Sequence, residues 1–396
     1  MSVRQRLYPG PGQEEILSRH CSDARFVYNL GLEQRNLWRR DRTAKVTWSS
    51  QCKELAQARQ EFCWLKEGSS VVQQAALRDL DKAFQNWWSG SHRRPTWRKA
   101  GVNEGFYIRD LLVRKLSRKW GEVLAPKAGW VRFRLTRSWT EMEACSSARV
   151  TLDRSGRWNV SFTAGQPSAS RESNGSVIGL DMGIASTVTT SDGSHLNMPK
   201  LFSSGEAQRK HRLQRKLARQ KKGSKRRERT KLSISKLCAK EVDRRKDWTR
   251  KTTTSLVRDY DLVAIEDLRV KNMVRSAKGT VGEPGKNVAQ KAGLNRSIQS
   301  QAWSLFRKRL DDKAAASGVI VVAIDPKHTS QTCSACQYHA PENRESQAVF
   351  VCKACGYGEN ADTNAAKNIL AAGLAVTARG GTPGYGPSEA RTTRVA

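Results

Sequence analysis

Apolar positions recur at helical spacing through most of the first 100 residues. In residues 13–33, "QEEILSRHCSDARFVYNLGLE", and in residues 69–88, "SSVVQQAALRDLDKAFQNWW", they return every three or four positions and form one apolar face. Ser69 and Ser70 stand where the second face begins and are candidate N-caps. The loop "SGSHRRPTWRKAG" then interrupts the pattern with glycine, proline and several cations. The pattern predicts a helical domain over residues 11–100.

A two-residue alternation of apolar and polar positions replaces the helical period further along the chain. "WVRFRLTRSW", "SARVTLDRSG" and "RWNVSFTAG" alternate in this way and end in turn-forming residues. They predict strands of a β-rich, barrel-like domain over residues 101–168, to which we assign residues 1–10 as the first strand. The Ser- and Gly-rich residues 169–176 are expected to form a linker.

The remainder of the chain alternates short strands with helices. "SVIGLDMGIASTVTTSDGSHLNM" predicts three short strands, while "DLVAIEDL" and "VIVVAID" predict buried ones. Helices are expected over a long basic tract, residues 206–258, over "SIQSQAWSLFRKRLDDKAAAS", which Gly318 ends, and over "NAAKNILAAGLAV". The Gly- and Pro-rich residues 379–396 are expected to be a disordered tail.

The charge indicates the kind of partner. The chain has 71 Lys and Arg against 37 Asp and Glu, a formal net charge of +34 in 396 residues. This excess favours a polyanion, either nucleic acid or an anionic membrane. The chain contains no run of 18 apolar residues and does not begin with an apolar signal sequence, so we expect nucleic acid as partner, no membrane, and a cytoplasmic location in a prokaryotic cell. Nine cysteines without regular disulfide spacing agree with a reducing compartment.

Three carboxylates stand at the ends of elements that are otherwise apolar. Asp181 ends "VIGLD", Glu266 ends "LVAIE", and Asp362 opens the final helix. A carboxylate at the end of a buried strand loses hydration, and a divalent cation is the usual compensation. Each acid alone could be a turn residue or a helix cap, and Asp267 could replace Glu266 in that role. All three together, in a strongly basic chain, indicate catalysis.

The order of elements resembles the ribonuclease H fold, in which the first and fourth strands lie side by side at the sheet centre. Acids on these strands and on the last helix would then converge, and two Mg²⁺ ions held by them would support phosphodiester cleavage. The order Asp, Glu, Asp resembles RuvC-type nucleases, whereas strand-joining transposases of this fold carry Asp, Asp, Glu. Cleavage is therefore expected rather than strand joining.

Four cysteines form two C-x-x-C pairs, Cys333 with Cys336 and Cys352 with Cys355, separated by 15 residues. This spacing is typical of a four-cysteine structural zinc site, in which sulfur fills every coordination position. The alternatives are reduced structural cysteines and a redox motif. His328 and His339 lie nearby but are not needed as ligands.

Several segments together resemble the TnpB family of RNA-guided nucleases of insertion sequences, which is related to compact type V CRISPR effectors. They are "GLDMGIASTVTTSDG", "DLVAIEDLRVKNM", "TSQTCSACQ", "FVCKACGYGENADTNAAKNIL", the basic "LQRKLARQKKGSKRRERTKL" and the opening "YPGPGQEEILSRHCSDARFVYNLGLE". The resemblance covers nearly the whole chain. One departure is Asn360 where the family often has the first acid of an Asp-Arg-Asp motif; the catalytic position, Asp362, is retained.

The resemblance implies a multidomain α+β fold in which a helical domain and a β-rich wedge domain precede a ribonuclease H-like (RuvC) α/β domain with an inserted four-cysteine zinc ribbon. The expected boundaries are 1–10 for the first wedge strand, 11–100 for the helical recognition domain, 101–168 for the wedge domain, 169–176 for the linker, 177–328 for the nuclease domain, 329–359 for the zinc finger, 360–378 for the final nuclease helix and 379–396 for the tail.

The resemblance also implies ligands and partners. Asp181, Glu266 and Asp362 match the catalytic acids and would bind Mg²⁺, with Mn²⁺ as a substitute, while Cys333, Cys336, Cys352 and Cys355 match the zinc ligands. A guide RNA would pair with one strand of a double-stranded DNA target, and the protein would read a short flanking motif. We expect one protein chain per RNA.

Candidate nucleic-acid contacts lie in three segments. Residues 207–231 hold 13 Lys and Arg and one acid, and the alternative to a phosphate-binding face is a solvated helix face. Trp97 lies among cations, which suits base stacking, although it could equally be core; Trp87 and Trp88 are expected in the core. Ser70 and Gln74 are candidate readers of the flanking motif. The full set is Ser70, Gln74, Arg93, Arg94, Trp97, Arg98, Arg209, Arg212, Arg215, Lys216, Arg219, Lys221, Lys222, Lys225, Arg226 and Arg227.

The expected function is RNA-guided DNA cleavage at one metal-dependent site. A CRISPR effector of the same chemistry and a cleavage-deficient, RNA-guided repressor are the alternatives. The presence of all three acids favours the enzyme over the repressor.

Overall fold

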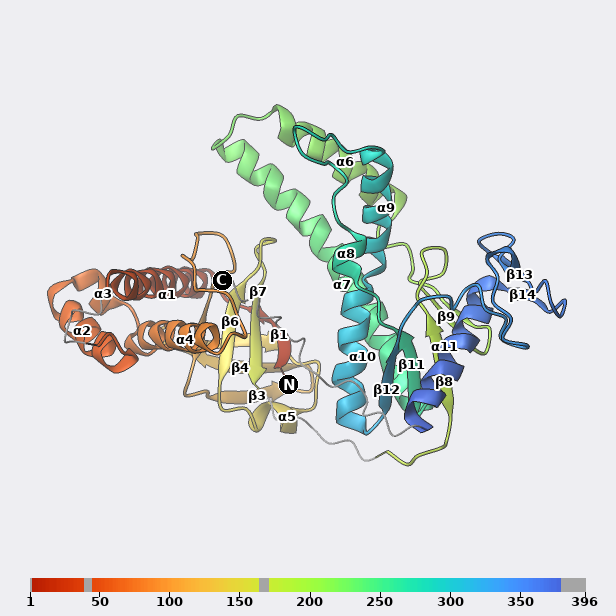
Figure 1. The fold of residues 1–396 in the computed structure, drawn as a ribbon. Coiled ribbons are helices and arrows are strands. Elements are labelled where there is room, and N and C mark those ends of the chain that lie inside the picture. The colour runs from red at the N-terminus through yellow and green to blue at the C-terminus, as the bar shows by residue number, and fades with distance from the viewer. Residues whose placement is uncertain (1, 39–44, 164–170, 379–396) are drawn as a thin grey trace. The chain divides into compact units, whose positions relative to one another are not determined.

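A computed structural model describes residues 2–38, 45–163 and 171–378 (Figure 1). The fold is mixed α/β, and the described chain divides into two compact units. The first unit holds the described residues up to 163 together with 212–236, and the second holds the rest. Within these ranges, no helix combines the length and apolarity needed to cross a bilayer. The expected tail and the start of the expected linker lie outside the described residues.

The helices of the first unit follow the apolar periodicity of the sequence. They are α1 (Pro11–Leu37), α2 (Trp48–Glu61), α3 (Cys63–Glu67), α4 (Ser70–Trp88) and the short α5 (Trp139–Glu143). Proline at the first position of α1 has the backbone angle a helix needs and lacks only an N–H that would be unpaired there. Ser69 occupies the N-cap of α4 but makes no side-chain capping hydrogen bond, and Ser70 is the first helical residue.

A seven-stranded sheet completes the first unit. Its strands are β1 (Ser2–Tyr8), β2 (Gly105–Ile108), β3 (Val113–Ser117), β4 (Trp120–Ala125), β5 (Gly129–Arg134), β6 (Ala148–Leu152) and β7 (Trp158–Thr163). Their order is β2-β6-β7-β1-β5-β4-β3, so the first residues of the chain lie between strands that come more than 120 residues later. Along β5, Val131 and Phe133 are buried while Arg132 between them is exposed, as the two-residue alternation predicts.

The second unit contains a five-stranded sheet in the order β10-β9-β8-β11-β12. Its strands are β8 (Val177–Asp181), β9 (Val188–Thr190), β10 (His195–Leu196), β11 (Leu262–Glu266) and β12 (Ile320–Ile324). β11 pairs in parallel with β8 on one side and β12 on the other. Residues 262–265 are buried, which explains their continuous apolar sequence. The three short strands expected before the basic tract are confirmed as β8, β9 and β10.

Two helices expected to be continuous are each interrupted. The basic tract forms α6 (Ser204–Arg219) and α7 (Lys225–Asp259), separated by a turn in which Gly223 has φ +82°. The next expected helix forms α9 (Val288–Gln301) and α10 (Trp303–Ser317), because Ala302 adopts the left-handed conformation with φ +56°. Gly318, with φ +71°, ends α10 as predicted. The short α8 (Val270–Met273) follows β11.

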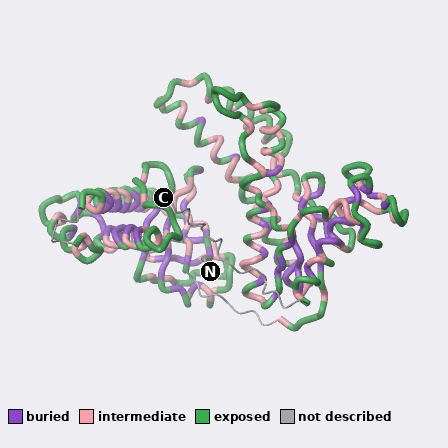
Figure 2. The backbone as a smooth tube through the Cα atoms, viewed as in Figure 1, coloured by how far each residue is buried: buried purple, intermediate pink, exposed green. Residues whose placement is uncertain are grey.

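The last helix, α11 (Ala361–Ala378), packs directly on β8 and β11. Glycines permit the close approach. A Cβ atom at Gly179 would lie 2.2 Å from the carbonyl oxygen of Ala366, and one at Gly373 would lie 2.6 Å from the Cβ of Ala264. Figure 2 shows buried residues concentrated on the strands and on α1, α4 and α11. The sheet and α11 therefore share one core, which fixes where α11 begins.

A small ribbon precedes α11. It contains the 3-10 turn η1 (Pro341–Asn343) and the antiparallel pair β13 (Val349–Val351) and β14 (Gly358–Asn360). An isolated bridge joins Thr332 to His339 within its first half.

Candidate active site and metal centre

The two strand-end acids lie on neighbouring strands. Leu180 of β8 is paired with Ile265 of β11, and Asp181 and Glu266 are the next residue of each strand. The carboxyl ends of parallel strands meet at one edge of a sheet, which is where ligands of open α/β sheets bind. The parallel pairing of β8 with β11 therefore brings Asp181 and Glu266 to the same edge.

Asp362 reaches this edge from the first turn of α11. The side-chain oxygen of Asn360 accepts hydrogen bonds from the backbone N–H groups of Asp362, at 3.0 Å, and Thr363, at 3.2 Å. Asn360 therefore caps the helix that carries the aspartate. A Cβ atom at Gly183, directly after β8, would lie 3.8 Å from a carboxylate oxygen of Asp362. The turn after β8 and the start of α11 are thus adjacent.

The three acids are close enough to repel one another electrostatically. Burial, and next the charge of Asp362, raise the pKa of Asp181 to about 7. Burial, and next the charge of Asp181, raise the pKa of Glu266 to about 8. Both carboxyls accept a hydrogen bond from the backbone N–H of Met182, which only partly offsets these effects. The cluster is therefore short of positive charge.

Two further residues at this cluster were missed by the sequence analysis. Arg344, from the ribbon, lies 3.7 Å from Asp362 and lowers the pKa of Asp181. Thr329 donates its hydroxyl hydrogen to Glu266 over 3.3 Å. Neither residue belongs to a periodic pattern that links it to the acids. One signal for Arg344 was present in the sequence: the cysteine ribbon that contains it directly precedes Asp362.

A hollow of about 400 Å³ opens beside Glu266. Trp303, Arg307 and Lys308 of α10 line it together with Met182. Arg307 is paired with Asp311 at 2.9 Å. Asp267, Asp311 and Asp312 also line the hollow, which therefore gives access to Glu266 from the α10 side.

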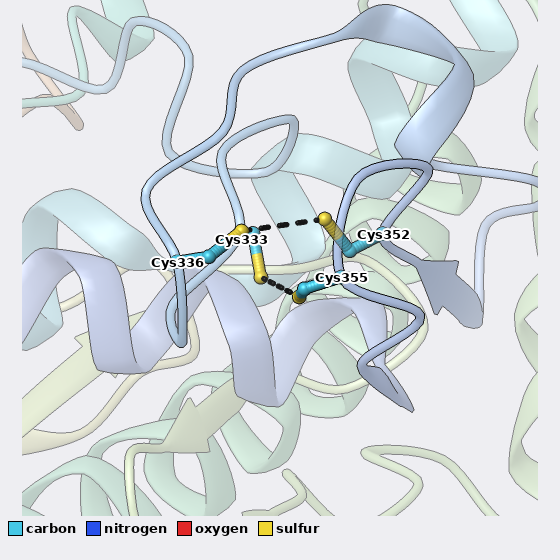
Figure 3. Close-up of side chains that lie close together, drawn as sticks. All are labelled: Cys333, Cys336, Cys352 and Cys355. Carbon is cyan, nitrogen blue, oxygen red and sulfur yellow. Dashed lines mark hydrogen bonds between the residues drawn. The ribbon is translucent and has the colours of Figure 1, made fainter.

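The four ribbon cysteines converge on one point (Figure 3). Their sulfur atoms all lie within 4.8 Å of one another, with Cys333–Cys355 at 3.8 Å and Cys336–Cys352 at 3.6 Å. Although burial opposes it, hydrogen bonds from the backbone N–H groups of Cys355 and Ala354 lower the pKa of Cys352 to about 6. Although a backbone hydrogen bond from Tyr338 opposes it, the neighbouring thiols raise the pKa of Cys336 to about 12. Four sulfur atoms this close together suit a bound metal ion, which would compensate the charge of their thiolates. Across the described ranges, only these four side chains bring three or more metal-binding atoms so close together.

The first cysteine knuckle is attached to α11 by asparagine side chains. Asn364 donates to the carbonyl of Thr332 at 2.8 Å and accepts from the backbone N–H of Ser334 at 2.9 Å. Asn368 donates to the carbonyls of Thr329 and Thr332. The ribbon and the helix that carries Asp362 therefore form one structural piece. His328 and His339 hydrogen-bond to each other at 2.9 Å and lie outside the sulfur cluster.

The candidate nucleic-acid contacts in the first unit differ in whether their side chains are exposed or used within the protein. Ser70, Arg93 and Arg94 are exposed, as is Trp97 at 49%, while Gln74 lines a hollow of about 280 Å³ with Trp48 and Arg78. Arg98 lies 3.8 Å above the ring of Tyr28 and pairs with Asp79, so it is used within the protein.

The expectation that Trp87 and Trp88 belong to the core is wrong, because both side chains are exposed. Trp88 is 65% exposed and Trp87 36%. Both lie in the last turn of α4, where Trp87 contacts Phe84 and has Arg94 over its ring.

Most candidate nucleic-acid contacts on α6, on the turn after it and at the start of α7 are exposed. Arg209, Arg212, Arg215, Lys216, Arg219, Lys221, Lys222, Lys225 and Arg226 are exposed. Arg227 instead donates to the carbonyls of Leu217 and Gln220 and closes the end of α6. The structure thus leaves a nearly continuous cationic surface on α6, the turn and the start of α7.

Comparison with known proteins relates the chain to guided nucleases. Family models match residues 160–277 ("Probable transposase"), 303–369 ("Cas12f1-like, TNB domain") and 1–43 ("Helix-turn-helix domain"). InsQ of Escherichia coli (strain K12), named as an RNA-guided DNA endonuclease, is 36% identical over 379 residues, covering 95% of this chain and 92% of InsQ. A protein of Streptomyces pristinaespiralis with the same type of name is 32% identical, covering 96% of this chain and 90% of its own.

A solved structure of Cas12f1 with sgRNA and target DNA has a similar fold. Its TM-score is 0.55 at 12% sequence identity, over 91% of this chain and 83% of Cas12f1. From the near full-length similarity to InsQ, together with the matching family models, we conclude that the chain belongs to the TnpB family, which is related to Cas12f.

Proposed function

We propose that this protein is an RNA-guided DNA endonuclease that cleaves DNA at the cluster of Asp181, Glu266 and Asp362. The observation that carries the proposal is that these three acids meet at one sheet edge in a chain whose near full-length relatives carry that name. A guide RNA would select the target by base pairing, and the protein would read a short flanking DNA motif.

The acid cluster has the chemistry of a magnesium site. Burial and mutual repulsion raise the pKa values of Asp181 and Glu266, so their charged forms need compensation that one arginine does not supply. Oxygen ligands from carboxylates are those that Mg²⁺ and Mn²⁺ prefer. Bound Mg²⁺, two ions in our proposal, would supply an activated water and neutralise charge that develops on the phosphate.

The residues around the cluster would hold its carboxylates in place. Thr329 and the N–H of Met182 hydrogen-bond to Glu266, and Arg344 limits repulsion between Asp181 and Asp362.

The cysteine cluster fits structural Zn²⁺. Four sulfur atoms within 4.8 Å of one another leave no open position for substrate. Because Asn364 and Asn368 attach the ribbon to α11, the ribbon would keep Asp362 and Arg344 in register with the two strands.

The finer architecture also belongs to this proposal. We assign the seven-stranded sheet to a wedge domain, the five-stranded sheet with α11 to a RuvC-like domain, and the cysteine ribbon to a zinc-finger insertion, with the boundaries given above. The exposed cations of α6 and the start of α7 would contact RNA phosphates. One protein chain per RNA and a cytoplasmic location remain expectations.

Three other functions are less well supported than guided cleavage or overlap with it. The family model over residues 160–277 describes a transposase, but the acid order Asp, Glu, Asp favours cleavage over strand joining. A guided repressor is disfavoured because all three acids are present, two at the ends of paired strands and the third on the helix that packs against those strands. A CRISPR effector would share the chemistry and differ in the origin of its RNA.

The test is to express the protein with its native flanking DNA and sequence the RNA that copurifies. The complex is then incubated with a plasmid library that carries the guide-complementary sequence beside randomised flanks, with Mg²⁺ or with EDTA. We expect a discrete RNA and Mg²⁺-dependent cuts beside one flanking motif. Asp181→Asn should abolish cutting, whereas Asp325→Asn should not, because Asp325 is exposed at the end of β12 and outside the cluster.

Binding of the target without any cutting would support the repressor instead. The absence of a discrete copurifying RNA would overturn guided recognition.

A further inference from the structure

A single buried side chain joins the two cysteine knuckles of the ribbon, residues 331–338 and 352–357. Asn343 ends the turn η1 and is 0% exposed. Its amide group donates hydrogen bonds to the carbonyl oxygens of Gln331, at 3.0 Å, and Tyr338, at 3.1 Å, in the first knuckle. Its side-chain oxygen accepts a hydrogen bond from the backbone N–H of Lys353, at 2.9 Å, in the second knuckle. Both N–H groups and the oxygen of this side chain are therefore used, and they bind both knuckles.

Each knuckle is closed by its own backbone. The N–H of Cys333 donates to the carbonyl of Tyr338 at 3.0 Å, and the N–H of Cys352 donates to the carbonyl of Tyr357 at 2.9 Å. These two hydrogen bonds shape each knuckle separately, since neither crosses from one knuckle to the other. The position of one knuckle relative to the other therefore depends on other contacts, among which are those of Asn343.

The apolar core of the ribbon is small. Its buried members are Cys333, Phe350, Cys352 and Ala361. So few apolar side chains contribute little stability on their own, and small domains of this kind depend on further links. Removing the Asn343 side chain would take a hydrogen-bond partner from three backbone groups and leave a void, which is costly at a buried position.

Arg344, the residue after Asn343, extends from the same turn to the acid cluster. Its backbone N–H donates to the carbonyl of Pro341 at 3.2 Å, and an isolated bridge pairs it with Phe350. Its guanidinium lies 3.7 Å from the carboxylate of Asp362. The backbone from which Arg344 extends is therefore part of the turn that Asn343 attaches to both knuckles.

The hydrogen bonds of the ribbon lead back to Asp362 by a second route. Asn364 of α11 binds the first knuckle at the carbonyl of Thr332 and the N–H of Ser334. α11 also carries Asp362 in its first turn. A shift of one knuckle against the other would therefore change the distance between Arg344 and Asp362.

We propose that Asn343 is a positioning residue for cleavage, which fixes the spacing of the two knuckles and thereby holds Arg344 beside Asp362. Zinc bound by the four sulfur atoms would link the cysteines themselves, whereas Asn343 links the backbone around them to the turn that carries Arg344. The cleavage part of this inference rests on the proposed function, and the ribbon part does not.

The first test measures how fast zinc leaves the ribbon. The zinc-loaded full chain is mixed with an excess of a chromophoric zinc chelator, without guide or target. Asn343→Ala removes all three hydrogen bonds, and Asn343→Asp keeps the shape of the side chain but loses both donors. Glu342→Ala is the matched control, because Glu342 lies in the same turn and is exposed.

We expect zinc to leave Asn343→Ala and Asn343→Asp about tenfold faster than the wild type, because hydrogen bonds behind metal ligands strengthen metal binding. Glu342→Ala should match the wild type. Wild-type release by either Asn343 variant would overturn the role of these hydrogen bonds. Hydrogen exchange of the zinc-loaded wild type needs no substitution: the N–H of Lys353 should be protected, and rapid exchange there would contradict the link between the knuckles.

The second test asks whether Asn343 acts through Arg344. Single-turnover guided cleavage is measured in excess zinc for Asn343→Ala, Arg344→Gln and the double variant. We expect Asn343→Ala to cut about tenfold more slowly even with zinc bound, and the double variant to cut no more slowly than Arg344→Gln alone. Additive losses, or full cleavage by zinc-loaded Asn343→Ala, would overturn the positioning role.

The two tests separate this inference from the proposed function. If the wild type did not cut a matching target, the proposed function would fail and the cleavage role of Asn343 with it. Zinc release would still decide whether Asn343 holds the knuckles together, because it requires neither RNA nor DNA. Fast zinc release combined with wild-type cleavage would confirm the ribbon link and overturn the positioning of Arg344.

Discussion

The folded protein disfavours the charged forms of Asp181 and Glu266, and neighbouring protein groups only partly compensate for this effect. Their pKa values of about 7 and about 8 mean that, without a cation, the folded state holds protons that the unfolded state releases above about pH 4. Stability that depends on those protons is present at low pH and is lost as the pH rises through the folded-state values.

The loss of stability with rising pH can be tested on the metal-free protein. In EDTA, the free energy of unfolding of the second unit should fall between about pH 5 and pH 8. Asp181→Asn should raise it at pH 8 by about 1–3 kcal/mol, since it removes a buried charge. Chemical denaturation of the wild type and of Asp181→Asn in EDTA, at pH 5 and at pH 8, measures these free energies of unfolding.

Asp192→Asn, in the same unit, is the control for that experiment. Although burial opposes it, hydrogen bonds from Thr190 and Ser194 lower the pKa of Asp192. Its substitution should therefore destabilise the protein at pH 8. A lower stability of Asp181→Asn at pH 8 without metal would contradict our account of the cluster.

Arg344 gives the second prediction at this scale. It lowers the pKa of Asp181 and lies 3.7 Å from Asp362, so Arg344→Gln should shift the acidic limb of the cleavage rate to higher pH. Arg344→Lys should restore part of the shift because it restores the charge. The pH profile of single-turnover cleavage measures both; a uniform loss of rate with an unchanged profile would indicate a purely structural arginine.

At the scale of elements, the position of α11 sets the distance from Asp362 to the strands. Gly373 lies inside α11 with its Cβ position 2.6 Å from Ala264, whereas Gly293 inside α9 has only a flexible arginine at 3.9 Å. Gly373→Ala should destabilise the second unit by about 1–3 kcal/mol and reduce cleavage. Gly293→Ala should be neutral or stabilising by up to about 1 kcal/mol. Thermal unfolding and cleavage assays compare the stability and activity of the two variants. If Gly373→Ala were as stable and active as the wild type, the close packing of α11 on β11 would be refuted.

The ribbon provides the other prediction at this scale. We expect about one zinc ion per chain in the wild type and in Cys63→Ser, which changes an exposed cysteine outside the cluster, and much less in Cys352→Ser. Loss of zinc should reduce cleavage even in excess Mg²⁺, because the ribbon attaches to α11. Elemental analysis and cleavage assays test this; full cleavage by zinc-free protein would contradict it.

The sequence predicted those features that periodicity and strand ends encode. Asp181 and Glu266 could be found because each ends an apolar run, and the four cysteines because of their spacing. The break at Ala302 could not be found, since alanine carries no signal for a left-handed backbone. Arg344, Arg98 and Arg227 required tertiary contacts: the first reaches the acids, and the other two are used within the protein.

At the scale of the whole molecule, a net charge of +34 and two compact units suit a protein organised around a nucleic acid. The acid cluster and the cysteine ribbon both belong to the second unit. In the proposed function, base pairing with the RNA selects the DNA sequence that is cut, and the acid cluster carries out the cleavage.

The most direct test exchanges the guide segment of the copurifying RNA and maps the cuts on a plasmid that carries both target sequences beside the same flanking motif. We predict that the cut moves to the sequence matching the new guide, requires Mg²⁺ and disappears with Asp181→Asn. A cut that stays at the original sequence, or that occurs without matching RNA, would contradict guided cleavage by this protein.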